Sequence, residues 1–148
     1  MAELARLHSP SEIEIVIATD EMAPEIERLA EANGFAFDGW IIDWSHVSGS
    51  WLVAMWEDEI VGCIQVLPAH PVGRLELQFI DPEQHHRVRA IAVKKLLTAG
   101  FAALRASGVQ GVASTVPYEL GDYREILRKH FGGIDLNEGW IMLARTKL

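Results

Sequence analysis

Apolar residues repeat along this chain at two different spacings, and the change between them separates strands from helices. Residues 73–80 alternate apolar and polar side chains at period two, as in a half-buried strand, and Asp81-Pro82 stops the pattern. A polar, basic segment follows over residues 83–89. Apolar residues then return at roughly helical spacing, before an apolar run over residues 109–116; the helical positions are Ile91, Leu96, Leu97, Phe101 and Leu104. The pattern predicts a strand–loop–helix–strand unit whose helix N-terminus, with its unpaired N–H groups, points at an anion past the strand's carboxyl end.

The residues before this unit predict a strand, a helix and a hairpin. The β-branched, alternating run 13–18 is the first strand. Thr19-Asp20 offers N-cap oxygens to a helix that Asn33-Gly34 ends; the buried stripe of this helix is Ile26, Leu29 and Ala30. Two apolar runs, 51–56 and 60–67, flank an acidic turn and predict a hairpin. Between helix and hairpin, residues 35–50 predict a short helix with loops, in which Trp40 and Trp44 cover the core.

The C-terminal part continues with one helix and one strand. The pattern predicts a helix over residues 118–130, with Ile126 and Leu127 facing inward and Gly132-Gly133 ending it. A turn at residues 137–139 then leads into a last strand over residues 140–144. No repeat or composition shift marks a linker, so we expect one domain over residues 1–148, with residues 1–11 as a short arm.

Composition and charge exclude several classes of function. The chain has 148 residues, of which 49% are hydrophobic and 23% charged, the balance of a globular protein. A net charge of −8 argues against a nucleic-acid partner, because such binding draws on clustered Lys and Arg. A single cysteine, Cys63, predicts a small core residue in a reducing compartment. Without an apolar run long enough for a membrane span or a signal-peptide pattern, we expect a cytoplasmic protein without a membrane partner.

Several phrases resemble the GCN5-related N-acetyltransferases, or GNAT family. Residues 17–26 resemble the first strand and helix start of that family, and residues 51–54 with 58–62 resemble its strand 2 to strand 3 hairpin. Residues 131–132 and 140–143 are similar to its closing segment. The resemblance implies an α+β fold in three layers, with a mixed, mostly antiparallel central sheet flanked by helices. It also implies acetyl-CoA as co-substrate.

The loop that binds the coenzyme pyrophosphate in this family has the form Arg or Gln, two residues, Gly, one residue, Gly or Ala. Glycines suit such a loop because a Cβ would stand where phosphate oxygens approach. One register puts Arg87 in the basic position, with Ala90 and Ala92 as the small residues. The spacing from Pro82 instead puts His85 in the basic position and Val88 in place of the first glycine. Both registers stay open.

The candidate phosphate-binding residues are therefore the segment from Arg87 to Ala90 together with Ala92. In it, the amides of Val88, Arg89 and Ala90 would contact the pyrophosphate, and Arg87 and Arg89 would attract the phosphate charge. A solvated helix face is an equally good interpretation of these arginines. Adjacent His85 and His86 lack a third ligand at a useful spacing, so we expect no metal site.

Acetyl transfer to an amine needs a base, because a protonated amine has no lone pair for attack. Glu76 is the candidate: alternation puts it on one face with Gln78, and Leu75, Leu77 and Phe79 on the other. An exposed strand carboxylate is the competing interpretation.

The resemblance assigns the oxyanion to a backbone N–H near Phe79 or Ile80. The family often uses a tyrosine on its last helix as acid. Leu127 occupies that position here, and Tyr123, one turn earlier, is the candidate substitute, with core packing as the simpler interpretation.

Two functions follow from these observations. The first is an acyl-CoA-dependent N-acyltransferase that transfers acetyl to an amine of a small molecule or a protein. The second is a catalytically inactive binding or structural module of the same fold, acting through the segment that contains Trp40 and Trp44. The acidic surface favours a cationic amine. The oligomeric state stays open, a homodimer included.

Overall fold

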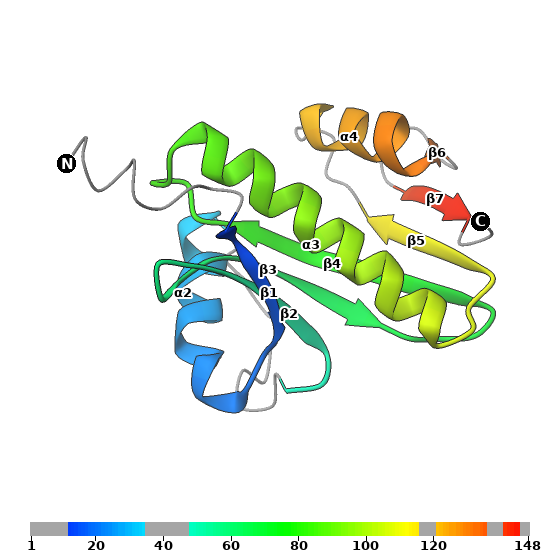
Figure 1. The fold of residues 1–148 in the computed structure, drawn as a ribbon. Coiled ribbons are helices and arrows are strands. Elements are labelled where there is room, and N and C mark those ends of the chain that lie inside the picture. Colours follow the sequence, from blue (N-terminus) through cyan, green and yellow to red (C-terminus); the bar gives the residue numbers. More distant parts are fainter. Residues whose placement is uncertain (1–11, 35–47, 116–120, 136–140, 146–148) are drawn as a thin grey trace. The chain divides into compact units, whose positions relative to one another are not determined.

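The computed structural model describes residues 12–34, 48–115, 121–135 and 141–145. These residues form two compact units, and β3, β4 and α3 contribute to both (Figure 1). The first unit consists of the described residues up to Ile64 together with Leu77–Ala99, and the second consists of Gln65–Glu76 and the described residues from Gly100 onward. The prediction of one domain over residues 1–148 therefore stays a prediction.

The described elements follow the predicted order. They are β1 (Glu14–Ile17), η2 (Asp20–Met22), α2 (Ala23–Ala32), β2 (Trp51–Trp56), β3 (Glu59–Leu67), β4 (Val72–Ile80), α3 (His86–Ala106), β5 (Gly111–Thr115), α4 (Gly121–Phe131), β6 (Ile134–Asp135) and β7 (Ile141–Arg145). The predicted arm 1–11, the start of the helix at Tyr118 and the turn at 137–139 lie outside the described residues, as does most of the segment 35–50, with Trp40 and Trp44.

Within the described residues the strands pair in the order β1-β2-β3-β4-β5-β7-β6. β1 is antiparallel to β2, and β7 is antiparallel to both β5 and β6. β4 and β5 are parallel, with Val72 opposite Gly111 and Arg74 opposite Ala113, as expected for two strands joined through a helix. The sheet is therefore mixed and mostly antiparallel, and the fold class is α+β as predicted.

The hairpin forms because a two-residue turn joins its strands. Glu57 and Asp58 both have positive φ, 52° and 64°, the backbone of a type I′ turn, whose twist matches that of the flanking strands. This confirms the predicted hairpin.

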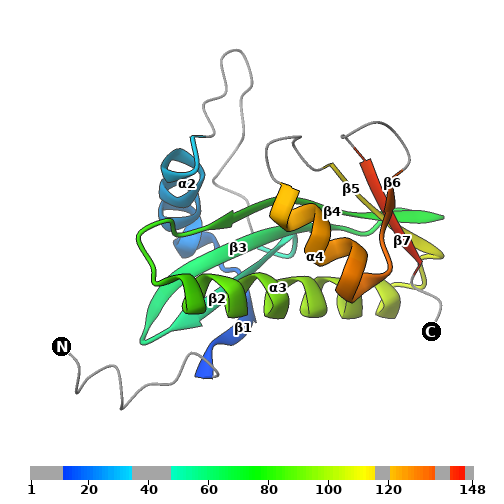
Figure 2. The same cartoon turned by 90° about the horizontal axis from the view of Figure 1, so that it is seen from above.

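In the first unit, α2 and α3 lie on different faces of the β3–β4 region (Figure 2), and apolar side chains pack on both faces. Cys63 belongs to a cluster with Ile26 and Leu29, two residues of the buried stripe predicted for α2. Its neighbour Gly62 faces α3 instead, because a Cβ built there would lie 3.2 Å from Leu96 Cδ1. Successive residues of β3 thus pack against different helices.

The second unit packs the C-terminal turns of α3 against β4 and α4. A Cβ at Gly73 would lie 2.8 Å from Leu104, and a Cβ at Gly100 would lie 2.7 Å from Leu75, so these glycines allow helix and strand to approach closely. The rings of Phe101 and Phe131 stack with centroids 5.0 Å apart. These contacts bury Phe101 and Leu104, two residues of the helical stripe predicted for α3, and tie that helix to α4.

The predicted N-cap of α2 is wrong. Thr19 makes no side-chain capping bond; its carbonyl accepts the Met22 N–H at 3.0 Å, and a 3-10 turn precedes the helix. The Asp20 carboxylate accepts the N–H of Ser48 at 3.0 Å. The side chains of Thr19 and Asp20 therefore do not cap α2, and Pro24 lies in the first turn of this helix, where its missing N–H costs no hydrogen bond.

Candidate active site

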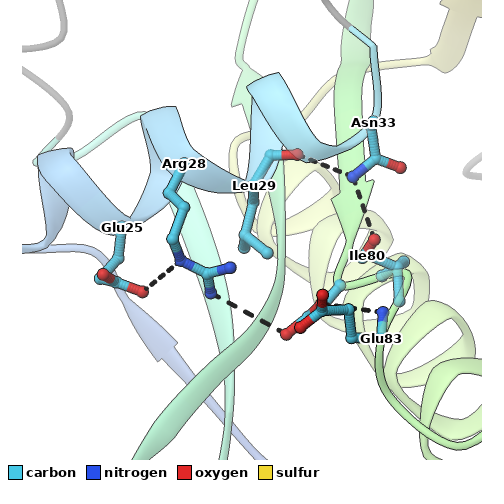
Figure 3. A network of polar contacts seen from close by, with 7 residues as sticks. Glu25, Arg28, Leu29, Asn33, Ile80 and Glu83 are labelled. Carbon is cyan, nitrogen blue, oxygen red and sulfur yellow. Dashed lines mark hydrogen bonds and ion pairs between the residues drawn. The ribbon is translucent and has the colours of Figure 1, made fainter.

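A polar network in the first unit fixes the place where β4 ends (Figure 3). The Asn33 amide, at the C-terminus of α2, donates to the Leu29 carbonyl at 2.7 Å and to the Ile80 carbonyl at 3.0 Å. Arg28 pairs with Glu25 at 3.0 Å and reaches Asp81 at 3.9 Å. The end of α2 is thereby bonded to the last residue of β4 and to the residue that follows it.

Asp81 organises the turn between β4 and α3. Its carboxylate accepts the Glu83 N–H at 3.0 Å and its carbonyl accepts the Gln84 N–H at 3.3 Å. Asp81 is buried, with 7% of its surface exposed, and this carboxylate-centred turn brings the chain directly into the first turn of α3.

The hydrogen-bond direction along β4 distinguishes Phe79 from Ile80 as oxyanion donors. The Asp81 N–H donates to Val61 of β3 at 2.9 Å. Because N–H groups alternate in direction along a strand, the Phe79 N–H also points toward β3, where it bonds to the Cys63 thiol. The main-chain N–H and carbonyl of Ile80 point to the other edge of β4, where the Asn33 amide donates to this carbonyl. Of the two predicted donors, only the Ile80 N–H lies on that edge.

The helix α3 begins at His86, four residues earlier than the polar segment 83–89 predicted. His85 caps it: its ring Nδ1 accepts the Arg87 N–H at 3.2 Å and its carbonyl accepts the Arg89 N–H at 3.1 Å. The N–H groups of the first helical turn have no acceptor within the helix. His85 accepts the N–H groups of Arg87 and Arg89. The N–H groups of His86 and Val88 therefore remain directed past the helix N-terminus.

The predicted phosphate-binding residues therefore divide between two turns of α3. Arg87 and Arg89 are exposed in the first turn, whereas the Val88 side chain is buried, with 2% of its surface exposed. The N–H groups of Ala90 and Ala92 lie in the second turn, where the carbonyls four residues earlier accept them, and Ala92 is fully buried. The buried Val88 side chain leaves the register with His85 in the basic position open beside the register with Arg87.

The predicted alternation along β4 breaks at Leu77. Gly73 and Leu75 face α3, but after Leu77 the residues that face it are Gln78, which donates to the Val93 carbonyl at 3.5 Å, and Ile80. Leu77 has a φ of 49°, a left-handed conformation unusual for leucine. Leu77 and Phe79 pack in the cluster with α2. The prediction that Leu75 shares a face with Leu77 and Phe79, and Glu76 with Gln78, is therefore wrong.

In the second unit, the Glu76 carboxylate is held by two residues. Oε1 accepts Arg74 Nη2 at 2.6 Å and Arg74 Nε at 2.9 Å. The Thr115 N–H donates to Oε2 at 3.3 Å, and the Thr115 hydroxyl lies 3.4 Å from Oε1. Only 13% of the Glu76 side chain is exposed. Glu76 is thus an ion-paired, largely buried carboxylate.

Tyr123 of α4 lies in the same unit and contacts Ser114, the neighbour of Thr115. Burial raises the pKa of Tyr123 well above its ordinary value, and the negative charge of Glu76 adds to this, while the hydrogen bond with Ser114 opposes it. The phenol therefore stays protonated at neutral pH. Leu127, where the family resemblance implies a tyrosine, is buried with 3% of its surface exposed.

Sequence reasoning missed the residues that hold these groups in place. Asn33 was interpreted only as the end of a helix, and nothing in the local pattern indicated its bond to Ile80. Arg74 stands two residues before Glu76 on the same strand, a spacing that could have suggested the ion pair. Thr115 carries no such signal, because it is far from Glu76 in the sequence.

The structure is similar to solved structures of acetyltransferases. N-acetylglutamate synthase from Neisseria gonorrhoeae, complexed with coenzyme A and L-arginine, matches with a TM-score of 0.72 and 14% identity over 92% of this chain. The chain of that synthase is much longer, and the match spans 34% of it. PaiA N-acetyltransferase from Thermoplasma acidophilum, in complex with coenzyme A, matches with a TM-score of 0.65 and 18% identity, over 90% of this chain and 99% of its own.

This chain has the GNAT fold. Diaminobutyrate acetyltransferase EctA from Paenibacillus lautus, in complex with L-2,4-diaminobutyric acid and coenzyme A, gives a TM-score of 0.70 at 12% identity, over 91% of this chain and 95% of its own. No protein-family model matches the sequence, and no curated protein matches it. At these identities the GNAT fold is established by the structure, and the activity is a separate question.

Three further observations concern the described residues of this GNAT fold. Cys63 is fully buried, and burial raises the pKa of its thiol to about 12, so it is an inert core residue as predicted. Among the described residues, His, Cys, Asp and Glu side chains form no group of three or more that could hold a metal ion. No helix in the described ranges is long and apolar enough to cross a membrane.

Proposed function

We propose that this protein is an acyl-CoA-dependent N-acyltransferase that transfers acetyl from acetyl-CoA to an amine. The observation that carries the proposal is the start of α3 in a GNAT fold: the helix opens five residues after Asp81, and its first turn keeps N–H groups directed outward. Such a helix end stabilises phosphate through its amides and its dipole. Acetyl-CoA, when bound, supplies the acyl group as a thioester.

The side chains around this helix end fit a pyrophosphate. The N–H groups of His86 and Val88 would donate to it, and the exposed Arg87 and Arg89 would add positive charge. The buried Val88 side chain leaves the approach open, although a glycine is usual in the family the sequence resembles. The amides of Ala90 and Ala92 support the site through the helix dipole, since both lie in the second turn.

The chemical step needs an oxyanion donor, a base and an acid. The N–H of Ile80 is our choice of donor, because it lies on the strand edge away from β3. Tyr123 is protonated at neutral pH, which an acid requires. Glu76 as base and Tyr123 as acid remain predictions from the sequence.

The acceptor is proposed to be a cationic amine. The chain carries a net charge of −8, and an acidic surface attracts cations over a Debye length. The EctA structure contains its substrate L-2,4-diaminobutyric acid, an amine of this charge class. A lysine side chain or the N-terminus of a protein has the same chemistry.

Titration calorimetry with acetyl-CoA tests the proposal. We expect binding with a 1:1 stoichiometry and a rise in melting temperature, because a ligand that binds only the folded state stabilises it. Arg89→Ala should weaken binding about tenfold, the effect of one charge-assisted contact. The matched control is Arg105→Ala, an exposed arginine in the last turn of the same helix, which should leave the affinity unchanged.

Absence of both heat and thermal shift at millimolar acetyl-CoA would favour the second candidate, a non-catalytic module with the same fold. Two observations favour that candidate: the Glu76 carboxylate is occupied by Arg74 and Thr115, and Leu127 stands where the family's tyrosine is expected. Binding without turnover of any amine would lead to the same conclusion.

A further inference from the structure

The parallel ladder between β4 and β5 ends within the second unit. Its last paired residues are Arg74 and Ala113, although β5 continues to Thr115. In a continued parallel ladder the Thr115 N–H would be given to a main-chain carbonyl of β4. Here the Glu76 side chain takes it, with Oε2 3.3 Å from the Thr115 nitrogen. The carboxylate therefore replaces a strand carbonyl at the end of the ladder.

The other oxygen of Glu76, Oε1, completes a set of mutual contacts among Arg74, Glu76 and Thr115. Arg74 donates to Oε1 through Nη2 and Nε, at 2.6 and 2.9 Å, and Arg74 Nη2 also lies 3.3 Å from the Thr115 hydroxyl. The hydroxyl in turn reaches Oε1 at 3.4 Å. A carboxylate offers about four lone-pair directions: three donors converge on Oε1, and the Thr115 N–H is the one donor to Oε2 among the described residues.

These charge-assisted contacts oppose a role as general base. A base must have a lone pair directed at the proton it removes, within hydrogen-bond reach or through one water. Proton uptake by Glu76 would remove the negative charge with which Arg74 pairs and to which the Thr115 N–H donates, so both contacts would lose their charge assistance. Charge-assisted bonds of this kind are roughly twice as strong as neutral ones.

We infer that Glu76 is a positioning residue that ends the β4–β5 ladder and holds Thr115 in place, and that it is not the base. As a statement about the reaction, this rests on the proposed acyltransferase function; as a statement about the ladder, it stands on the contacts alone. The side chain acts through Thr115 and its neighbour Ser114, the residue that bonds to Tyr123. Glu76 therefore affects catalysis indirectly, through the position of the residues at the end of β5.

Two substitutions of Glu76 distinguish the length of its side chain from its ability to act as a base. Glu76→Asp keeps a carboxylate but is one methylene shorter, so it loses the reach to Thr115. Glu76→Gln keeps the length and one carbonyl oxygen, which accepts the Thr115 N–H when the NH2 group takes the place of Oε1 beside Arg74. This variant therefore loses the ion pair, and it cannot act as a base at neutral pH. Glu125→Gln is the control, since Glu125 pairs with Arg128 on the exposed surface of α4 in the same unit.

Amide hydrogen exchange of Thr115, measured by NMR, is the direct readout. We expect exchange to accelerate at least tenfold in Glu76→Asp and to stay within about threefold of wild type in Glu76→Gln and Glu125→Gln. Unchanged exchange in Glu76→Asp would overturn the inference. Because this measurement needs no substrate, it decides the role of Glu76 at the ladder even if the protein proves to have no transferase activity.

The pH dependence of acetyl transfer is the second readout. A positioning role predicts that Glu76→Gln keeps most of the wild-type kcat and the same ascending limb of the pH profile, whereas Glu76→Asp lowers kcat without moving that limb. A base role predicts the reverse for Glu76→Gln, with a loss of about a hundredfold or more and no ascending limb. That result would overturn the inference, and it would leave the proposed function standing.

Discussion

Replacing Asn33 with alanine tests the link between the end of α2 and the end of β4. The substitution removes the amide that donates to Leu29 at 2.7 Å and to Ile80 at 3.0 Å. Asn33 is the C-cap of α2, so alanine changes little in the helix interior. Ile80 is 8% exposed, and water therefore reaches its carbonyl poorly once the amide is gone.

The expected loss follows from these two bonds. A net contribution of about 1 kcal/mol for each hydrogen bond gives about 2 kcal/mol in the free energy of unfolding. For a chain of this size, that corresponds to a fall of about 4 to 8 °C in melting temperature. Asn33→Asp should lose at least as much, because the carboxylate cannot donate and because its charge is unfavourable at a helix C-terminus.

Urea denaturation followed by circular dichroism gives the free energy of unfolding directly, with thermal melts as a second measure. Glu31→Ala is the control, because Glu31 is exposed in the last turn of the same helix. We expect this control to lie within about 0.5 kcal/mol of wild type, as for most surface substitutions. A loss below about 0.3 kcal/mol in Asn33→Ala, or an equal loss in the control, would show that the amide does not hold β4.

Two other predictions concern the core. Gly62→Ala should lower the free energy of unfolding by about 1–3 kcal/mol in urea, because its Cβ would lie 2.7 Å from Ile80 Cδ1 and 3.3 Å from a backbone carbonyl. In Gly100→Ala the three atoms nearest to the new Cβ all belong to the Leu75 side chain, and the variant gains about 1 kcal/mol of helix propensity, so it should be close to neutral. A larger loss there than at Gly62 would contradict the packing. For Cys63, burial raises the pKa from 9.0 to about 12, so the native thiol keeps its proton while the unfolded one loses it. Stability should therefore fall by about 1.4 kcal/mol per pH unit from pH 9 upward, and denaturation curves of Cys63→Ala should lack this component; parallel pH dependences would refute it.

The elements that the sequence predicted well are those whose signals are local. The stripe of α2 buries Ile26 and Leu29 because residues three and four apart share a helix face. The hairpin follows from two apolar runs flanking an acidic turn. In both cases the residues that decide the structure lie within one element, so their spacing alone is sufficient.

The interruption of β4 could not be predicted in this way. Residues 73–80 alternate without a break in the sequence, and leucine disfavours the left-handed backbone that Leu77 adopts. The conformation is fixed by packing, because it turns Leu77 and Phe79 toward the cluster with α2 while Gly73 and Leu75 face α3. The partners that stabilise it belong to other elements.

The start of α3 was misjudged for a different reason. His86, Arg87 and Arg89 are polar because they are exposed on the first helical turn, and polarity of this kind also describes a loop. The cap is His85, which is not among the residues that usually signal a helix N-terminus. The contact between Glu76 and Thr115 could not be predicted either, because the β4–α3–β5 crossover separates these two residues in the sequence.

The hairpin tip has a consequence for how this sequence can vary. A type I′ turn needs left-handed backbone at both central residues, and Glu57 and Asp58 supply it at 52° and 64°. Aspartate tolerates this region, whereas glutamate does so at a cost of about 1 kcal/mol or more. Substitution of residue 57 by Asn or Gly and of residue 58 by Gly should therefore be tolerated during evolution. Val, Ile and Thr should be selected against at both positions. The tip can change its charge without changing the fold.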